Sequence, residues 1–167
     1  VALSDTKPYS PSNNIPAQFV AAPVLDDGKI VGVVALQISI DAVNAIMSER
    51  SGMGESGETY LIGPDNLMRS DSFLNPDDHS VAASFANPSK GSIDSDAAQD
   101  ALKGNESNDI VIDYNGNPVL SSYKLIDIGG GVKWAVLSEI DEAEAFAPIY
   151  QLQAWVLGIL IAATVAI

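Results

Sequence analysis

The stretch SGMGESGETYLIGPDNLMRSDS, residues 51–72, decides how the rest of the chain is interpreted. Its glycines Gly52, Gly54 and Gly57 match the G-x-G-x-x-G pattern of dinucleotide-binding folds. That pattern requires a strand before the glycines and a helix after them, because the pyrophosphate binds at the helix N-terminus. Here a helical segment precedes the glycines, and the strand-like ETYLIG, residues 58–63, follows them. We therefore interpret the glycines as a left-handed turn that leads from a helix into a sheet.

The segment before the glycines predicts a β-hairpin and a short helix. Two β-branched apolar runs, residues 18–25 and 30–40, flank Asp26-Asp27-Gly28-Lys29, and Asp-Gly between such runs is typical of a hairpin turn. In DAVNAIMSER, residues 41–50, apolar side chains recur at helical spacing behind Ser39 or Asp41, either of which can cap the helix. Residues 1–50 are therefore expected to form two strands and a linking helix.

The segment after the glycines predicts an antiparallel sheet with a helical insertion. We expect strands at residues 58–63, 67–73, 109–114, 118–128 and 132–140. The polar segment 75–108 interrupts them and contains one expected helix, residues 95–104, which ends at Gly104. The fold class is therefore α+β, with a five-stranded antiparallel sheet whose one face is covered by the insertion.

The C-terminal end predicts a helix that enters a membrane. A helix is expected from Asp141, with an acidic first turn that complements the helix dipole. Residues 154–167 are apolar apart from one threonine, but fourteen helical residues cover only ~21 Å, about two-thirds of a bilayer core. A complete segment of that length is more often a buried helix. This run reaches the last residue, lacks amphipathic periodicity and begins near Tyr150 and Trp155, which favours a truncated transmembrane helix.

Charge and composition exclude several functions. Eight Lys and Arg residues against 22 Asp and Glu give a net charge of −14, which repels nucleic acid. The sequence contains no cysteine, which excludes disulfides, thiolate metal sites and cysteine nucleophiles. Because it starts at Val1 and stops inside an apolar run, we expect it to be a fragment of a longer protein.

Candidate catalytic and metal-binding residues are few. The single histidine, His79, lies in the polar insertion beside two aspartates, without a serine elbow or a buried acid, so we expect a solvated loop residue. Asp94, Asp96 and Asp100 lack the glycine and the final glutamate of a calcium loop, and we expect them on the solvated face of a helix. We therefore expect no catalytic residue, no metal and no cofactor.

One cluster of polar and aromatic side chains could bind a small ligand. Tyr60, Arg69 and Asp71 lie on one expected hairpin, and Tyr123 lies on a later strand. Strand alternation places Arg69 and Asp71 on the same face of the sheet. A partly buried arginine there requires a carboxylate, which could come from Asp71 as a local ion pair or from an anionic ligand bound through two hydrogen bonds. Both alternatives remain open at this point.

A second cluster lies near the N-terminus. Asp5, Tyr9, Ser10 and Ser12 precede the first expected hairpin, in a stretch rich in proline and serine. They could line a pocket in a module whose front half lies upstream, or they could form an ordinary loop. The sequence leaves both possibilities open.

The order of these segments resembles bacterial double-Cache sensor domains. These are the extracytoplasmic, PAS-like ligand-sensing regions of methyl-accepting chemotaxis proteins, sensor histidine kinases and nucleotide cyclases. The resemblance rests on residues 8–39 (PYSPSNNIPAQFVAAPVLDDGKIVGVVALQIS), on residues 52–72, and on residues 115–149 (NGNPVLSSYKLIDIGGGVKWAVLSEIDEAEAFAPI) before the apolar helix. It covers nearly the whole chain, with residues 75–108 the least distinctive part.

The resemblance implies a division into three parts. Residues 1–47 correspond to the last strands and the linking helix of the membrane-distal module, and residues 51–140 to the membrane-proximal module. Residues 141–167 correspond to the descending helix and the start of the second transmembrane helix.

The same resemblance implies a small ligand. An amino acid, an organic acid or a similar metabolite would bind in the distal module near Tyr9 and Ser12, or in the proximal module near the first cluster. The candidate ligand-binding residues are Tyr9, Ser12, Tyr60, Arg69, Asp71 and Tyr123.

The sequence thus predicts a sensor rather than an enzyme. We expect the mainly periplasmic or extracellular region of a homodimeric receptor in the bacterial inner membrane, in which the C-terminal helix carries displacement to a cytoplasmic domain. A chemotaxis transducer is favoured over a histidine kinase or a cyclase, and any kinase or cyclase activity would lie in the missing cytoplasmic part. The alternative is a ligand-free, membrane-tethered structural or dimerisation module.

Overall fold

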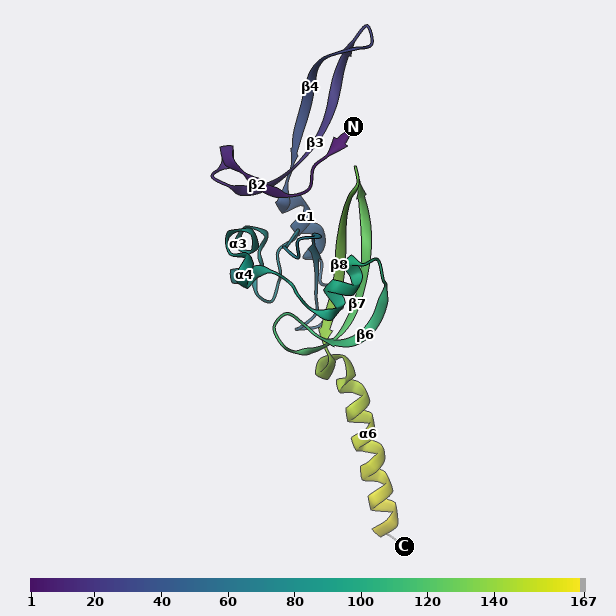
Figure 1. The fold of residues 1–167 in the computed structure, drawn as a ribbon. Coiled ribbons are helices and arrows are strands. Elements are labelled where there is room, and N and C mark those ends of the chain that lie inside the picture. The colour runs from purple at the N-terminus through teal and green to yellow at the C-terminus, as the bar shows by residue number, and fades with distance from the viewer. Residues whose placement is uncertain (166–167) are drawn as a thin grey trace.

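The protein, described here for residues 1–165 by a computed structural model, consists of two antiparallel sheets and a projecting helix (Figure 1). The N-terminal sheet contains β1 (Ala2–Leu3), β2 (Lys7–Tyr9), β3 (Ile15–Asp26) and β4 (Lys29–Ile38), and β3 pairs with each of the other three. The C-terminal sheet contains β5 (Glu58–Ile62), β6 (Ser107–Ile112), β7 (Pro118–Gly129) and β8 (Val132–Asp141), in the order β5-β8-β7-β6. The α+β class and the antiparallel pairing are confirmed.

The N-terminal hairpin and the helix after it match the sequence prediction. Asp27 and Gly28 both have positive φ, 44° and 76°, as a two-residue hairpin turn with the right twist requires. The helix α1 (Ile40–Met47) follows β4, and the Ser39 hydroxyl caps it by accepting a hydrogen bond from the N–H of Ala42 at 3.4 Å. Apolar side chains on both faces of the hairpin are exposed: Val24, Leu25, Ile30, Val31, Val33, Val34 and Leu36.

The C-terminal sheet has four strands, so the predicted fifth strand at residues 67–73 is wrong. That segment forms only isolated bridges to Ile62 and Ser92. Polar side chains take the hydrogen bonds that a strand would make with the sheet. The hydroxyl of Ser70 accepts a backbone N–H of β5 at 2.9 Å, and the backbone N–H of Asp71 donates to a side chain of α1 at 2.8 Å. The chain therefore leaves the sheet edge after one bridge.

The insertion between β5 and β6 contains four short helices, of which the sequence predicted one. The predicted helix at residues 95–104 is α5 (Asp96–Leu102), with Ser95 as its N-cap and Gly104 at a positive φ of 92° after its end. The other three are α2 (Pro76–His79), α3 (Val81–Ala86) and α4 (Pro88–Gly91). Helices of four to six residues are too short to show a helical period in a sequence.

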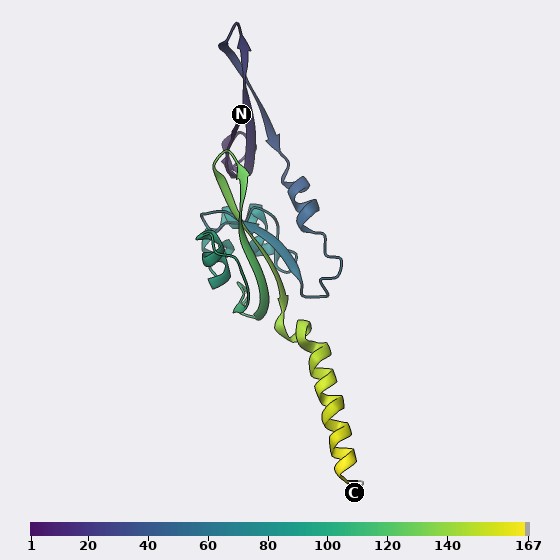
Figure 2. The same ribbon diagram turned by 90° about the vertical axis from the view of Figure 1, so that its right-hand side faces the viewer.

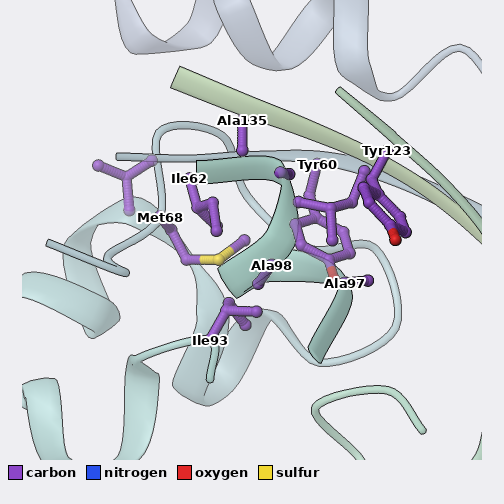
Figure 3. Close-up of a cluster of buried hydrophobic side chains, with 11 residues drawn as sticks. Tyr60, Ile62, Met68, Ile93, Ala97, Ala98, Tyr123 and Ala135 are labelled. Carbon is purple, nitrogen blue, oxygen red and sulfur yellow. The ribbon is translucent and has the colours of Figure 1, made fainter. Parts of the chain in front are cut away.

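The core lies between one face of the C-terminal sheet and the insertion (Figure 3). Alternate residues of β5, β7 and β8 supply the sheet side, and α5 lies against it through alanines, whose small side chains allow a close approach. Burial of each large side chain contributes about 1.5–3 kcal/mol to stability. The core residues are Tyr60, Ile62, Met68, Val81, Ile93, Ala97, Ala98, Ala101, Tyr123, Ala135 and Leu137.

The helix α6 (Glu142–Val165) begins directly after β8 and runs away from both sheets (Figures 1 and 2). Pro148 lies inside it. Within residues 1–165, Glu142–Thr164 is the one helix long and apolar enough to cross a membrane, and none of it is buried against the chain. The apolar end is therefore not interior packing of the sheet. Residues 166–167 of the predicted membrane helix lie outside the described part.

Candidate functional site

A buried ion pair joins the N-terminal segment to the C-terminal sheet. Arg69 is only 2% exposed, and its Nε and Nη2 donate to the two carboxylate oxygens of Asp5 at 3.0 and 2.8 Å. Its Nη2 also lies 3.0 Å from the carboxylate of Asp65. Burial alone would lower the pKa of Arg69, but these two carboxylates outweigh it and raise that pKa. Arg69 therefore remains protonated, and its positive charge is held at this site by the two carboxylates.

Asp5 contacts the central strand of the C-terminal sheet as well. The indole Nε1 of Trp134, in β8, donates to Asp5 Oδ1 at 2.8 Å. Burial would raise the pKa of Asp5, but hydrogen bonds from Arg69 and Trp134 outweigh it and lower that pKa. Asp5 is therefore ionised at neutral pH, and it is an internal anion for Arg69. The sequence placed Asp5 in a different cluster, because 64 residues separate it from Arg69.

Asp71 contacts helices rather than Arg69, so of the two alternatives that the sequence left open, the local ion pair between them is wrong. Its Oδ2 accepts from the Nδ2 of Asn44 at 2.8 Å, and its backbone N–H donates to Asn44 Oδ1 at 2.8 Å. Its Oδ1 accepts the backbone N–H of Val81 at 2.7 Å, at the start of α3. Asp71 therefore fastens α1 to α3.

A pocket of about 450 Å³ lies where these elements meet, and we call it the junction pocket. Its walls come from β3, β4, α1, the segment after β5, and α3, and its lining is partly polar and partly apolar. Its volume falls in the usual range for small-molecule sites. The lining residues are Ile15, Pro16, Gln37, Ser39, Ile40, Asp41, Asn44, Asp71, Val81 and Ala82.

Two buried carboxylates lie directly opposite each other on β5 and β8. Glu139 is 4% exposed, and it accepts the hydroxyls of Tyr60 and Ser121, each at 2.8 Å. Burial raises the pKa of Glu139; the two hydroxyls oppose this shift, and the charges of Asp113 and Glu58 add to it. The two carboxylates thus lie beside the apolar cluster, which Glu139 contacts through Tyr60.

Glu58 organises the loop that follows the β5 edge. It accepts the hydroxyl of Ser72 at 2.8 Å and the backbone N–H groups of Phe73 and Leu74 at 2.9 and 3.2 Å. The hydroxyl of Tyr114 also donates to it. Every contact is internal, so Glu58 stabilises this loop.

His79 is buried, so the expectation of a solvated loop histidine is wrong. Its side chain belongs to α2, and its ring centroid lies 4.4 Å from that of Tyr114. Burial lowers the pKa of His79, and in the described part of the chain its Nδ1 has no hydrogen-bond partner. A neutral ring packed on an aromatic neighbour fits these observations. Helix α2, which the sequence did not reveal, brings the ring inside.

The other predicted ligand residues lie in two places. Tyr60 and Tyr123 share one face of the C-terminal sheet, both opposite Leu137 of β8, and both belong to the core (Figure 3). Tyr9 packs edge-on against Phe19 with ring centroids 4.9 Å apart. Ser12 ends the short 3₁₀ turn that follows β2. The structure thus brings Tyr60 near Tyr123 and Arg69 near Asp5, but it does not assemble the six predicted residues around one cavity.

The glycine pattern binds a carboxylate of the chain itself. Gly52 and Gly54 have positive φ, 82° and 68°, which confirms the predicted left-handed turn. The N–H groups of Glu55 and Ser56 donate to Glu144 of α6 at 2.7 and 2.8 Å, and the Ser56 hydroxyl donates to it as well. Successive backbone N–H groups in a turn form an anion-binding concavity. Here an internal glutamate occupies that concavity.

The chain belongs to the Cache domain family, whose model matches residues 2–149. No curated protein matches its sequence.

Solved structures of sensory domains share the fold. The periplasmic sensory domain of the Campylobacter jejuni chemoreceptor Tlp1 is 18% identical with a TM-score of 0.61, over 87% of this chain and 50% of that one. The ligand-binding domain of the Pseudomonas aeruginosa amino acid chemoreceptor PctB, in complex with L-Arg, is 20% identical with a TM-score of 0.54, over 87% and 56%.

A structure from another class of receptor also matches. The extracellular domain of mmHK1S-Z3, described as a histidine kinase, is 14% identical with a TM-score of 0.56, over 90% of this chain and 52% of that one. At these identities the likeness shows the fold alone. The chain spans about half the length of the solved domains that it matches.

Proposed function

We propose that the chain is the extracytoplasmic small-molecule sensor region of a bacterial transmembrane receptor. The observation that carries this proposal is the direct continuation of β8 into α6, with no residue between Asp141 and Glu142. A strand at the centre of a Cache fold is thereby joined to an exposed apolar helix. Movement of that strand displaces the helix.

The helix α6 leads into the membrane. Its first turn, with Glu142 and Glu144, is held at the loop, so the apolar residues after that turn form the start of the membrane span. Tyr150 and Trp155 lie where interfacial aromatic residues collect. The two sheets then lie on the periplasmic side of the inner membrane, the N-terminal sheet in the membrane-distal module and the C-terminal sheet in the proximal one.

The ligand is an amino acid, an organic acid or a similar small metabolite. The bound L-Arg of PctB supports this class, although identity to that protein is low. Tyr9 and Ser12 are the distal candidates, and Asp71 is the proximal one because it lines the junction pocket. Tyr60, Arg69, Asp71 and Tyr123 already have internal partners, so they contact a ligand only if those contacts rearrange.

The output is a chemotaxis transducer in preference to a histidine kinase or a cyclase, and the receptor acts as a homodimer. Chemoreceptors and a histidine kinase are both among the solved proteins that share the fold. A ligand that binds one of two states about tenfold better supplies ~1.4 kcal/mol. That free energy is enough to shift a receptor whose two signalling states have nearly equal free energies. It is not enough to rearrange a rigid domain.

Calorimetry on the full-length receptor tests this proposal. Amino acids, organic acids and polyamines are added in turn, and the melting temperature of the periplasmic region is recorded. A true ligand at a hundred times its dissociation constant stabilises the folded state by ~2.7 kcal/mol, so the melting temperature rises. If none of these compounds shifts it, the ligand-free structural or dimerisation module is the better account.

A further inference from the structure

We propose that Glu144 and the loop at residues 52–57 form a latch. Through this contact, movement at the junction between the two sheets is passed to α6. This inference rests on the proposed sensor function and names the contact that transmits its signal. The loop carries the glycine pattern, and its anion-binding concavity holds Glu144.

The latch spans the boundary between β8 and α6. The backbone N–H groups of Glu55 and Ser56 bind the two oxygens of the Glu144 carboxylate at 2.7 and 2.8 Å. The hydroxyl of Ser56 also accepts the backbone N–H of Asp141 at 3.1 Å. One loop therefore holds the last residue of the strand and the first turn of the helix.

Arg50 makes the loop a rigid block. Its Nε donates to the carbonyl of Gly57 at 2.7 Å, and its Nη2 donates to the carbonyls of Gly54 and Glu55 at 3.2 and 2.7 Å. Its guanidinium lies 3.5 Å from the ring centroid of Phe73. Arg50 thus binds carbonyl groups of the loop, and Glu144 binds two backbone amides of the same loop.

The loop is connected to the junction pocket through α1. Helix α1 ends three residues before Arg50, and its Asn44 lines the pocket and binds Asp71. A shift of α1 therefore reaches the loop directly. Two routes lead from the junction to the membrane helix: β8, which starts near the Trp134 contact with Asp5, and the chain from α1 through the loop to Glu144.

Two attachments fix the direction of α6, whereas β8 alone allows it to pivot. Glu144 is partly accessible to solvent, so its contact can open and close without unfolding the core. An exposed carboxylate held by backbone amides suits a reversible contact better than a buried ion pair does. The latch is therefore the adjustable part of the coupling.

Gly54 offers a way to open the latch while Glu144 stays in place. A Cβ on Gly54 would overlap the Glu144 carboxylate, whereas a Cβ on Gly52 would meet nothing within 4 Å. Both glycines have positive φ, so Gly54→Ala and Gly52→Ala strain the backbone in the same way. Gly52→Ala is therefore the matched control. For Glu144→Ala the matched control is Glu142→Ala, since Glu142 lies in the same first turn and the hydrogen bonds of the loop to that turn, in the described residues, go to Glu144.

The test uses the full-length receptor in bilayers, without any ligand. Spin labels at Ile46→Cys in α1 and Gln151→Cys in α6 report the distance between the two helices, and hydrogen exchange reports the amides of Glu55 and Ser56. Glu144→Ala and Gly54→Ala are expected to broaden the distance distribution and to speed exchange of these amides about tenfold or more. The two controls are expected to resemble the wild type.

Two results overturn the latch. One is an unchanged distance distribution in Glu144→Ala, which shows that β8 alone sets the direction of α6. The other is equal broadening in Gly54→Ala and Gly52→Ala, which assigns the effect to backbone strain. Because no ligand is used, either failure leaves the sensor proposal intact, and a failed ligand screen leaves the latch result intact.

Discussion

The contacts at the two ends of β8 differ in kind. At the β7–β8 end, the buried Arg69 and Trp134 hold Asp5 inside the protein. At the α6 end, loop amides hold Glu144, which remains accessible to water. Breaking a buried ion pair leaves an uncompensated charge, whereas breaking an exposed contact lets water replace it. The contacts at the β7–β8 end therefore hold the N-terminal segment against the C-terminal sheet. The Glu144 contact at the α6 end can open and close when the receptor signals.

Arg69→Ala is expected to cause the largest loss of stability. It leaves the carboxylates of Asp5 and Asp65, which are 19% and 44% exposed, without their cation, so the loss approaches but does not exceed the ~3–5 kcal/mol of a fully buried pair. Urea unfolding of the periplasmic region in the full-length protein measures it. The control is Lys124→Ala, whose partner Glu106 is exposed, so unfolding should not change measurably. A loss for Arg69→Ala no larger than for the control contradicts the assigned role of the buried end.

Asp71→Ala is expected to have an intermediate effect. It removes the hydrogen bonds that fasten α1 to α3, and unpaired amide groups there cost about 1–3 kcal/mol. Asp71→Asn retains an acceptor and should recover part of the loss. Hydrogen exchange in α1 measures the loosening, and exchange equal to that of the wild type argues against Asp71 as the fastening of α1.

The pH dependence of stability should distinguish Glu139 from Asp5, because their carboxyl groups have different surroundings. Burial raises the pKa of Glu139, so the unfolded chain releases this proton first as the pH rises. The stability that Glu139 contributes is present below its unfolded value of 4.5 and is lost as the pH rises through its folded pKa. Urea unfolding from pH 4.5 to 7 should therefore show the wild type losing stability relative to Glu139→Gln. A constant difference between the two contradicts this.

Asp5 is expected to behave in the opposite sense. Its pKa is lowered in the folded protein, so its contribution is present above the unfolded value of 3.8 and is lost as the pH falls through the folded pKa. The difference between wild type and Asp5→Asn should shrink in acid and stay constant near neutrality. Acid titration followed by tryptophan fluorescence measures it, since Trp134 contacts Asp5.

Glu144→Gln is expected to have the smallest effect on global stability. The amide keeps one oxygen for the loop, and the site is accessible to solvent, so the melting temperature should not change measurably. Local exchange at Ser56 should still increase. A large drop in melting temperature places Glu144 among the structural contacts and removes the contrast between the two ends of β8.

The sequence predicts most elements but few of the contacts between them. The β3–β4 hairpin, α1, α5 and the β6–β7 hairpin follow from local signals such as Asp-Gly turns and capping serines. The expected strand at residues 67–73 fails because serine and aspartate side chains replace its ladder hydrogen bonds. Local patterns do not show that replacement.

The candidate site was less predictable because its contacts are distant in the sequence. Arg69 was singled out as needing a carboxylate, but Asp5 lies 64 residues away. Glu144 lies 88 residues from Ser56, so the glycine pattern could be recognised as a turn without its anion. Contacts between residues so far apart in the sequence depend on the fold, which brings Asp5 to the start of β8 and the loop at residues 52–57 to its end.

The central claim is that α6 crosses lipid while it is fixed to β8. In the full-length protein in bilayers, spin labels placed singly from Leu152 to Ile161 can be tested for collisions with oxygen and with a water-soluble nickel complex. The account predicts that labels on the lipid-facing side of α6 collide with oxygen and are shielded from nickel, whereas a label at the exposed Lys133 collides with nickel. Nickel access on every side of α6 would contradict it.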